Sequence, residues 1–219
     1  MDYNYWVPLI KDSILAIAAV IASVIAILGL NTWKRQLYGQ SEYELAKRLL
    51  KSLYLFREAI NNVRHPFMQY SAIPDLPQDK LEQLSREEKE WYAQAQAYEK
   101  RWTPVGKARA DLDANVLESE VFWDNEIKHS MAKLSLLQAE LLVAIEEHIE
   151  RTNPRKPDKT YWGDNLRNNS AIMYGRNDRS KDPFLDRMLT AIEEIEAILK
   201  PYIRKGKKSK KTLLLIPGT

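Results

Sequence analysis

The sequence predicts an all-α protein, with an N-terminal transmembrane helix followed by a cytoplasmic bundle of four to five helices. Three observations support this fold class. An uncharged apolar run of seventeen residues lies close to the N-terminus. Glycine occurs only 7 times in 219 residues, while Ala, Leu, Glu, Lys and Gln recur, which favours helix over sheet. Downstream, apolar residues return every three or four positions, the period of an amphipathic helix.

The predicted membrane helix covers residues 14–33. Its apolar run, Ile14 to Leu30, contains no charge and no proline, and its Ile, Leu and Val residues favour insertion by roughly 3 to 6 kcal/mol in total. Trp6 and Trp33 bracket the run, about 40 Å apart along a helix, which matches a bilayer from interface to interface. The residues predicted to form the anchor are Trp6, Ile14, Ile21, Ile25, Leu30, Trp33, Lys34 and Arg35.

Basic residues predict the orientation of this helix. Lys11 is the only basic residue before the run, whereas Lys34 and Arg35 follow it directly. The positive-inside rule therefore leaves residues 1–13 outside the cell and places the C-terminal domain in the cytoplasm, with the anchor in the inner membrane. The chain opens with Asp2 and aromatic residues rather than a basic segment, which disfavours the rival interpretation of a cleaved signal peptide.

Small residues recur on one face of the predicted span. Ala18, Ala22 and Ala26 are spaced four apart, so two spans could approach closely along this face. Alanine is also common in such helices, and ordinary composition remains an alternative explanation. Association into homo-oligomers through this face is therefore one of two interpretations.

The predicted cytoplasmic bundle covers residues 41–203. After Gly39, Ser41 and Glu44 form a capping-box pattern that predicts a new helix, running to about Arg64. Ser85 and Glu88 form a second capping box. The apolar stripe predicted for the first of these helices is Leu45, Leu49, Leu53, Phe56 and Ile60.

Further helices complete the bundle. Thr103 before Pro104 predicts a kink or break. A regular helix is expected from about Asp124 to Arg151, and Asp182-Pro183 should begin the last helix. The stripe on the regular helix is Ile127, Met131, Leu134, Leu137, Leu141, Ile145 and Ile149, and that on the last helix is Phe184, Leu185, Met188, Leu189, Ile192, Ile195, Ile198 and Leu199.

Residues 152–181 are predicted to form a long loop, because turn-forming pairs such as Asn153-Pro154 recur along them. Long loops inside compact domains often carry function. The candidate partner surface in this loop consists of Tyr161, Trp162, Arg167, Tyr174 and Arg176. The alternative is a lid that packs over the bundle through Trp162, Ile172, Met173 and Tyr174.

Residues for catalysis, metals and cofactors are scarce. The chain has no cysteine, which excludes disulfides, thiolate zinc sites and a cysteine nucleophile. Its single Glu-x-x-His pair, Glu126 with His129, is half of what a di-iron bundle requires. No glycine-rich phosphate-binding motif is present. We therefore predict no catalytic, metal-binding or cofactor-binding residue.

The C-terminus, residues 204–219, is predicted to be a basic flexible tail. Its candidate lipid-contacting residues are Lys205, Lys207, Lys208, Lys210 and Lys211, which would be attracted to anionic headgroups. A solvated end without a partner is the alternative.

The rest of the chain is nearly neutral, which disfavours binding to nucleic acid. The aromatic residues Trp91, Tyr92, Tyr98 and Trp102 could stack single-stranded nucleic acid, but packing in the bundle is the favoured interpretation.

The block Leu30-Asn-Thr-Trp-Lys-Arg-Gln-Leu-Tyr-Gly, followed by Glu42 to Tyr54, resembles uncharacterised bacterial single-pass membrane proteins that have an N-terminal anchor and a cytosolic helical domain. The resemblance implies no activity and no site residues.

An anchor and a bundle without a recognisable catalytic or cofactor motif predict a non-enzymatic interaction, sensor or effector module in a cellular or phage-related system. Such a module would bind a protein partner or a second copy of itself. A membrane-bound enzyme with its site in the 152–181 region is the alternative.

Overall fold

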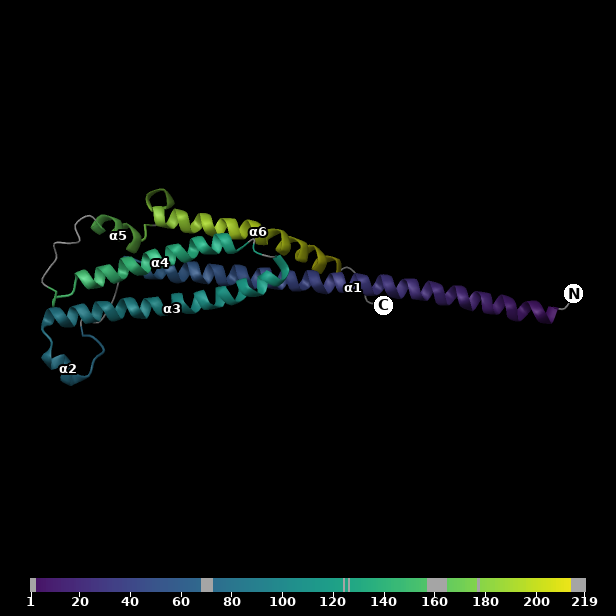
Figure 1. The fold of residues 1–219 in the computed structure, drawn as a ribbon, viewed down its shortest axis with the longest axis horizontal. Coiled ribbons are helices and arrows are strands. Elements are labelled where there is room, and N and C mark those ends of the chain that lie inside the picture. Colours follow the sequence, from purple (N-terminus) through teal and green to yellow (C-terminus); the bar gives the residue numbers. More distant parts are fainter. Residues whose placement is uncertain are drawn as a thin grey trace. The chain divides into compact units, whose positions relative to one another are not determined.

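The computed structural model describes residues 3–67, 73–123, 125, 127–156, 165–176 and 178–213, with the backbone alone at 3–10, 165–168 and 205–213. These residues form six α-helices and a 3-10 helix and contain no strand, which confirms the all-α prediction (Figure 1). The elements are α1 (Tyr3–Val63), α2 (Gln78–Gln83), α3 (Arg86–Trp123), α4 (Lys128–Arg151), α5 (Asn165–Met173), η2 (Arg179–Lys181) and α6 (Pro183–Leu213).

The chain divides into two compact units. Unit 1 consists of Met1–Glu44 and Tyr202–Thr219, and unit 2 of Leu45–Pro201. Both α1 and α6 therefore contribute to each unit. The two boundaries coincide with changes in burial: Leu45 is the first buried residue of α1, and Leu199 is the last buried residue of α6 within the part whose side chains are described.

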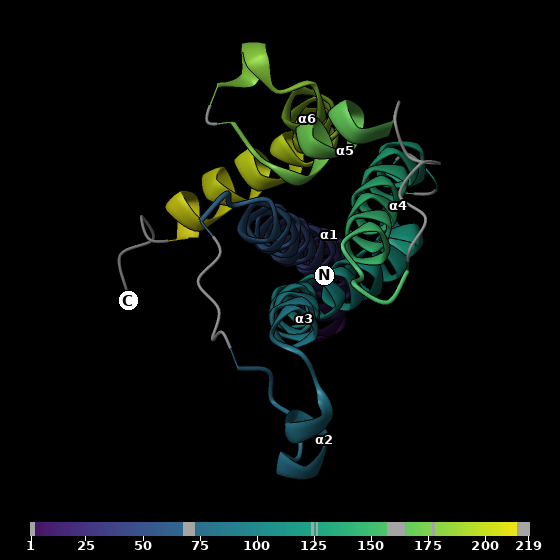
Figure 2. The ribbon, with the colours of Figure 1, turned by 90° about the vertical axis from the view of Figure 1, so that its left-hand side faces the viewer.

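Unit 2 is an antiparallel bundle of α1, α3, α4 and α6, which Figure 2 views end-on. On α1 and α6, Tyr54 pairs with Glu196 and Arg64 with Asp182, so the residue numbers rise along one helix as they fall along the other. Three further helix pairs show the same reversed order. Helices α1 and α3 are joined by Arg48–Glu118 and Ser52–Asn115, and α3 and α4 by Trp91–Ile149 and Arg109–Ser135. Helices α4 and α6 are joined by Lys133–Glu194 and Glu140–Arg187. Each long helix thus buries one face against two neighbours.

The predicted apolar stripes form the core of this bundle. All five residues predicted for α1 are at most 2% exposed. On α4, every residue of the stripe is buried except Ile149, which is half-buried. On α6, the buried members are Phe184, Met188, Ile192, Ile195 and Leu199, while the other three are half-buried. Periodicity therefore predicted the buried faces correctly, because burial on one side of a helix requires that spacing.

The predicted helix start at Ser41 is wrong. Helix α1 continues through Gly39 and Ser41, and the Ser41 hydroxyl donates to the Leu37 carbonyl at 3.1 Å, one turn back, instead of capping a helix N-terminus. A glycine within a helix costs only about 1 kcal/mol relative to alanine. Helix-favouring residues on both sides outweigh that cost.

The second capping box is confirmed. The backbone N–H of Ser85 donates to the Glu88 carboxylate at 2.7 Å, and the N–H of Glu88 donates to the Ser85 hydroxyl at 3.2 Å. By contrast, of the predicted kink or break at Pro104 the break is wrong, because α3 runs through the proline to Trp123. The Thr103 hydroxyl donates to the Glu99 carbonyl at 3.0 Å and is not an N-cap. Burial of Val105 and Leu112 helps to keep the segment helical despite the proline.

Three predicted boundaries also change. Helix α4 begins at Lys128 rather than at Asp124, which lies outside the described residues. The predicted loop at 152–181 contains α5 and η2. The tail predicted to be flexible from residue 204 instead continues α6 as far as Leu213. The last helix does begin at Pro183 as expected, with the Asp182 carboxylate accepting the N–H of Leu185 at 2.9 Å.

Candidate interaction surface

A buried ion pair holds the segment between α5 and α6 against the end of α1. The Arg64 Nη2 atom lies 2.9 Å from Asp182 Oδ1, and the side chains are 2% and 1% exposed. The Arg64 guanidinium also lies over the Phe184 ring, 4.2 Å from its centroid. Since a buried charge without a partner is very costly, each of the two groups requires the other.

Arg64 also binds the C-terminal end of α5. Its Nε donates to the Ile172 carbonyl at 2.6 Å, and its Nη2 donates to the Ala171 carbonyl at 3.1 Å. The backbone carbonyl of Arg64 accepts the N–H of Gly175 at 2.8 Å. One side chain therefore satisfies helix-end carbonyls and anchors the residues that follow α5.

Asp182 fixes the other end of the segment. Its second carboxylate oxygen accepts the backbone N–H of Arg176 at 2.9 Å, while its first oxygen accepts from Leu185 as well as from Arg64. Desolvation acts to raise the pKa of Asp182, but the hydrogen bonds from Arg64, Leu185 and Arg176 outweigh it and hold the pKa below its ordinary value. The group is therefore a carboxylate at neutral pH.

The two described side chains of the predicted partner surface lie on this fixed segment. Tyr174 is 38% exposed, and Arg176 is also exposed. Among the described residues, no ion-pair partner is found for the Arg176 side chain. Tyr161 and Trp162 lie outside the described residues, and Arg167 lies on α5 with its side chain outside them. An exposed aromatic and an exposed arginine on a hydrogen-bonded backbone are the residue types that are frequent at the centres of interfaces.

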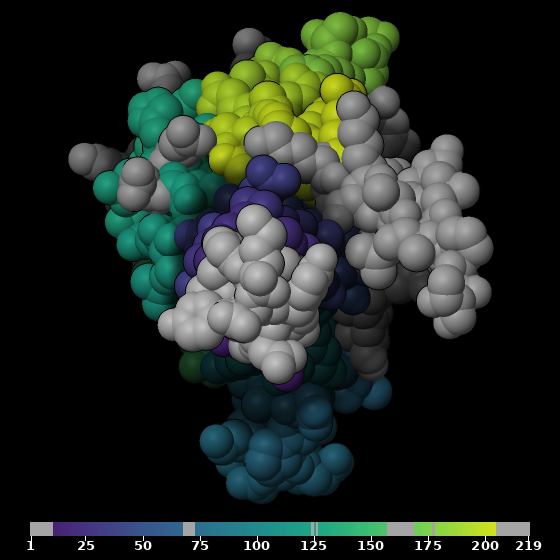
Figure 3. Space-filling view, turned by 90° about the vertical axis from the view of Figure 1, so that its right-hand side faces the viewer, coloured from purple at the N-terminus to yellow at the C-terminus, as the bar shows by residue number. Residues whose placement is uncertain are grey.

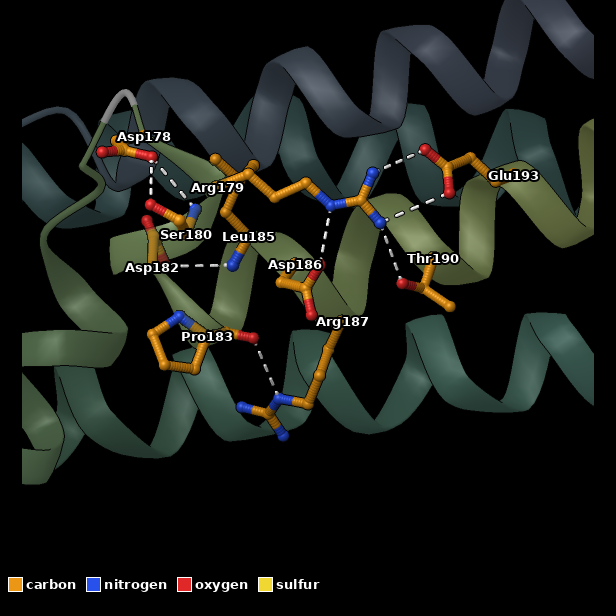
Figure 4. Close-up of polar contacts among 10 residues, drawn as sticks. All are labelled: Asp178, Arg179, Ser180, Asp182, Pro183, Leu185, Asp186, Arg187, Thr190 and Glu193. Carbon is orange, nitrogen blue, oxygen red and sulfur yellow. Dashed lines mark hydrogen bonds and ion pairs between the residues drawn. The ribbon is translucent and has the colours of Figure 1, made fainter.

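Arg179, the next arginine along the chain, differs from Arg176 because its side chain pairs with carboxylates (Figure 4). The Arg179 side chain runs along α6 and binds Asp186 at 2.6 Å and Glu193 at 2.7 Å, and it also reaches Thr190 at 3.1 Å. Hydrogen bonds from both carboxylates, that of Glu193 foremost, raise the pKa of Arg179. The charge of Arg179 is thus balanced within the molecule.

The lid interpretation of this region is partly supported. Ile172 and Met173 are 7% and 3% exposed, so the end of α5 does pack onto the bundle. Tyr174 lies on the exposed side, and Trp162 falls outside the described residues. Packing of α5 and presentation of Tyr174 are compatible, because the buried residues support the exposed one.

The aromatic residues of α3 mainly pack against α4. Tyr98 is 4% exposed, and the Trp91 indole N–H donates to the Ile149 carbonyl at 2.8 Å. Tyr92 lies against Trp91, with ring centroids 4.8 Å apart, and Trp102 is half-buried. These contacts support packing in the bundle rather than an open stacking platform for nucleic acid.

His148 is a half-buried titratable group in this same α3–α4 contact. Because Arg151 can only donate, His148 Nδ1 accepts from Arg151 Nη2 at 3.2 Å. The other ring nitrogen, Nε2, lies 3.3 Å from Nε2 of Gln94. Tyr98 lies edge-on to the ring. Desolvation, followed by repulsion from Arg151, lowers the pKa of His148 below its ordinary value.

We expect this histidine to make the bundle less stable in mild acid. Because the pKa is lower in the folded state, the unfolded chain gains a proton first, and stability falls as the pH drops below about 6.5, by at most about 1.4 kcal/mol per pH unit. Urea unfolding at pH 7.5 and pH 5.5 should show this loss in the wild type, and His148→Gln should reduce it. Replacement of the exposed His129 by Gln is the matched control, and an equal effect of both variants would contradict the assignment.

Metal-binding residues do not gather within the described part of the chain. No group of three or more His, Cys, Asp or Glu side chains there could hold a metal ion. His129 is exposed on α4, and Glu126 lies outside the described residues.

The predicted anchor lies in unit 1. Of the helices searched among the described residues, α1 alone is long and apolar enough to cross a membrane, and none of its most apolar eighteen-residue window is buried. Ile14, Ile21, Ile25, Leu30 and Trp33 are between 51% and 64% exposed, and Lys34 and Arg35 are also exposed. Trp6 lies on α1 with its side chain outside the description. A signal sequence would satisfy the same criteria of length and composition.

Sequence reasoning missed the Arg64–Asp182 pair. Asp182 was identified only as the cap of the last helix, and Arg64 only as the end of an earlier one. Because 118 residues separate them, no local pattern signals the pairing. Comparison of the chain with protein-family models, curated proteins and solved structures finds no match.

Proposed function

We propose that this chain is a single-pass protein of the inner membrane, with its N-terminus outside and its helical bundle in the cytoplasm. In this proposal the bundle binds a protein partner and acts as a non-enzymatic interaction, sensor or effector module. The observation that carries the proposal is the seventeen-residue apolar run of α1, which is exposed along its whole length. Such a run is costly in water and favourable in a bilayer.

Tyr174 and Arg176 support the choice of an interaction module. Both are exposed, and the buried Arg64–Asp182 pair fixes the backbone that carries them. A surface that is ordered before binding loses less conformational freedom when it binds, and tyrosine and arginine are frequent at the centres of interfaces. A partner with an acidic group near an apolar surface would complement these two side chains.

The test is purification of the full chain from native membranes in mild detergent, with mass spectrometry and a size measurement on the same fraction. We expect a reproducible partner or a second copy with the wild type, and at least a tenfold loss with the Tyr174→Ala/Arg176→Glu variant, since interface centres contribute about 2 kcal/mol or more. Lys107→Glu, at an exposed residue of α3, controls for charge reversal. A clean monomer in every preparation would contradict the interaction module and favour a search for an enzyme substrate.

A further inference from the structure

The last turns of α6 carry a concentrated positive charge. Six of the eight residues from 204 to 211 are basic, namely Arg204, Lys205, Lys207, Lys208, Lys210 and Lys211, and no acidic residue follows them in the chain. The structure continues α6 through this segment to Leu213. The charges are therefore carried by a helical extension of the bundle.

This extension lies beyond the core of unit 2. Leu199 is fully buried, Tyr202 and Ile203 are half-buried, and Arg204 is exposed. Unit 2 ends at Pro201, and residues 202–219 are grouped with the anchor-containing residues 1–44 in unit 1. Pro201 has no backbone N–H and weakens the helix where the two units meet. The basic segment is thus not part of unit 2.

The basic segment starts at the end of the bundle that leads to the anchor. The antiparallel pairing of Tyr54 with Glu196 places the last core residues of α6 near Leu45, the first core residue of α1. Figure 3 views the structure from this side, with turns of α6 in yellow.

The segment also has sufficient reach. Residues 31–44 separate the apolar run from the core and span about 21 Å as helix. The eight basic-segment residues span up to about 26 Å when extended. As helix the same residues span only about 12 Å, so the segment reaches the membrane surface at which the run ends when it extends.

We infer that residues 204–211 form a second membrane contact, which binds the anionic headgroups of the inner leaflet beside the exit of the anchor. The inference rests on the proposed anchoring and orientation. Lys34 and Arg35, which directly follow Asn31-Thr32-Trp33 after the apolar run, would add positive charge at the same leaflet. Each basic residue close to an anionic surface increases the binding constant of the segment for that surface about fivefold. The anchor already holds the segment at the membrane, which raises its effective concentration there.

The test uses the full chain, whose lack of cysteine allows one label to be placed at Ser209→Cys. The labelled protein is reconstituted in vesicles of phosphatidylcholine alone or with about 30% phosphatidylglycerol, and quenching by headgroup-labelled lipid is measured. We expect several-fold stronger quenching with the anionic lipid, reversed in about 1 M salt. Replacing the five lysines by glutamine should abolish the difference, whereas a label at Lys107→Cys should not respond to lipid charge.

Equal quenching in both vesicles would overturn the inference. Quenching that is independent of lipid charge but changes when a single-stranded oligonucleotide is added would also overturn the inference, and would favour binding of nucleic acid by the segment. An alkaline wash of the same vesicles separates the two proposals. Protein that washes off refutes the anchoring and this inference together, while protein that stays without charge-dependent quenching refutes the inference alone.

Discussion

Replacing Ile21 and Ile25 with arginine should move the protein from the membrane pellet to the soluble fraction. Each substitution removes a favourable residue and adds a charge near the centre of the run, and together they oppose insertion by roughly 6 to 8 kcal/mol. The whole run favours insertion by only about 3 to 6 kcal/mol. The double variant should therefore lose membrane integration, measured as the fraction that resists alkaline extraction.

The same variant distinguishes a membrane anchor from a helix of a soluble core. Ile21 and Ile25 are 54% and 64% exposed, so the two arginines should leave the thermal unfolding of the bundle unchanged. Ile21→Leu/Ile25→Leu preserves the apolar character and should remain in the membrane. Unfolding of the bundle by the arginine variant, or its retention in the membrane, would contradict the account.

Replacing Arg64 with methionine should destabilise the bundle by about 3 to 5 kcal/mol, because Asp182 is left buried without a counter-charge. The carbonyls of Ile172 and Ala171 also lose their donor. Urea unfolding of the full chain in detergent measures the change in unfolding free energy. Arg86→Met is the matched control, because the ion pair of that 91% exposed side chain should contribute no more than about 1 kcal/mol.

A second variant tests whether the ion pair itself is responsible. Arg64→Met/Asp182→Asn removes both charges and should recover part of the lost stability, since neither buried charge then remains unpaired. A loss below about 1 kcal/mol for Arg64→Met would contradict the role assigned to the pair.

The sequence predicted the helices that form the core better than it predicted where they begin and end. Apolar spacing reports burial on one face directly, so residues such as Leu49 and Ile195 were identified correctly. Capping boxes are local patterns that tertiary context can override. Ser85 caps a helix because α2 ends at Gln83 and Leu84 is extended, whereas Ser41 lies where the chain on both sides is already helical.

The candidate surface was predictable only in part. Tyr174 and Arg176 were selected because exposed aromatic and arginine residues often contact partners, and both are exposed. Helix α5 was not predicted, because its Asn165, Asn168 and Asn169 favour turns. The buried contacts of Ile172 and Met173 and the Arg64 hydrogen bonds help to hold this helix in place, and they depend on residues far away in the sequence.

The most direct test of the central claim is the membrane topology of two single-cysteine variants, Asn4→Cys and Lys107→Cys, in a chain that has no other cysteine. A membrane-impermeant maleimide is added to intact spheroplasts and, separately, after lysis. The account predicts that Asn4→Cys reacts in intact spheroplasts and Lys107→Cys only after lysis. Labelling of Lys107→Cys in intact spheroplasts, or protection of both residues until lysis, would contradict an anchored protein with its bundle in the cytoplasm.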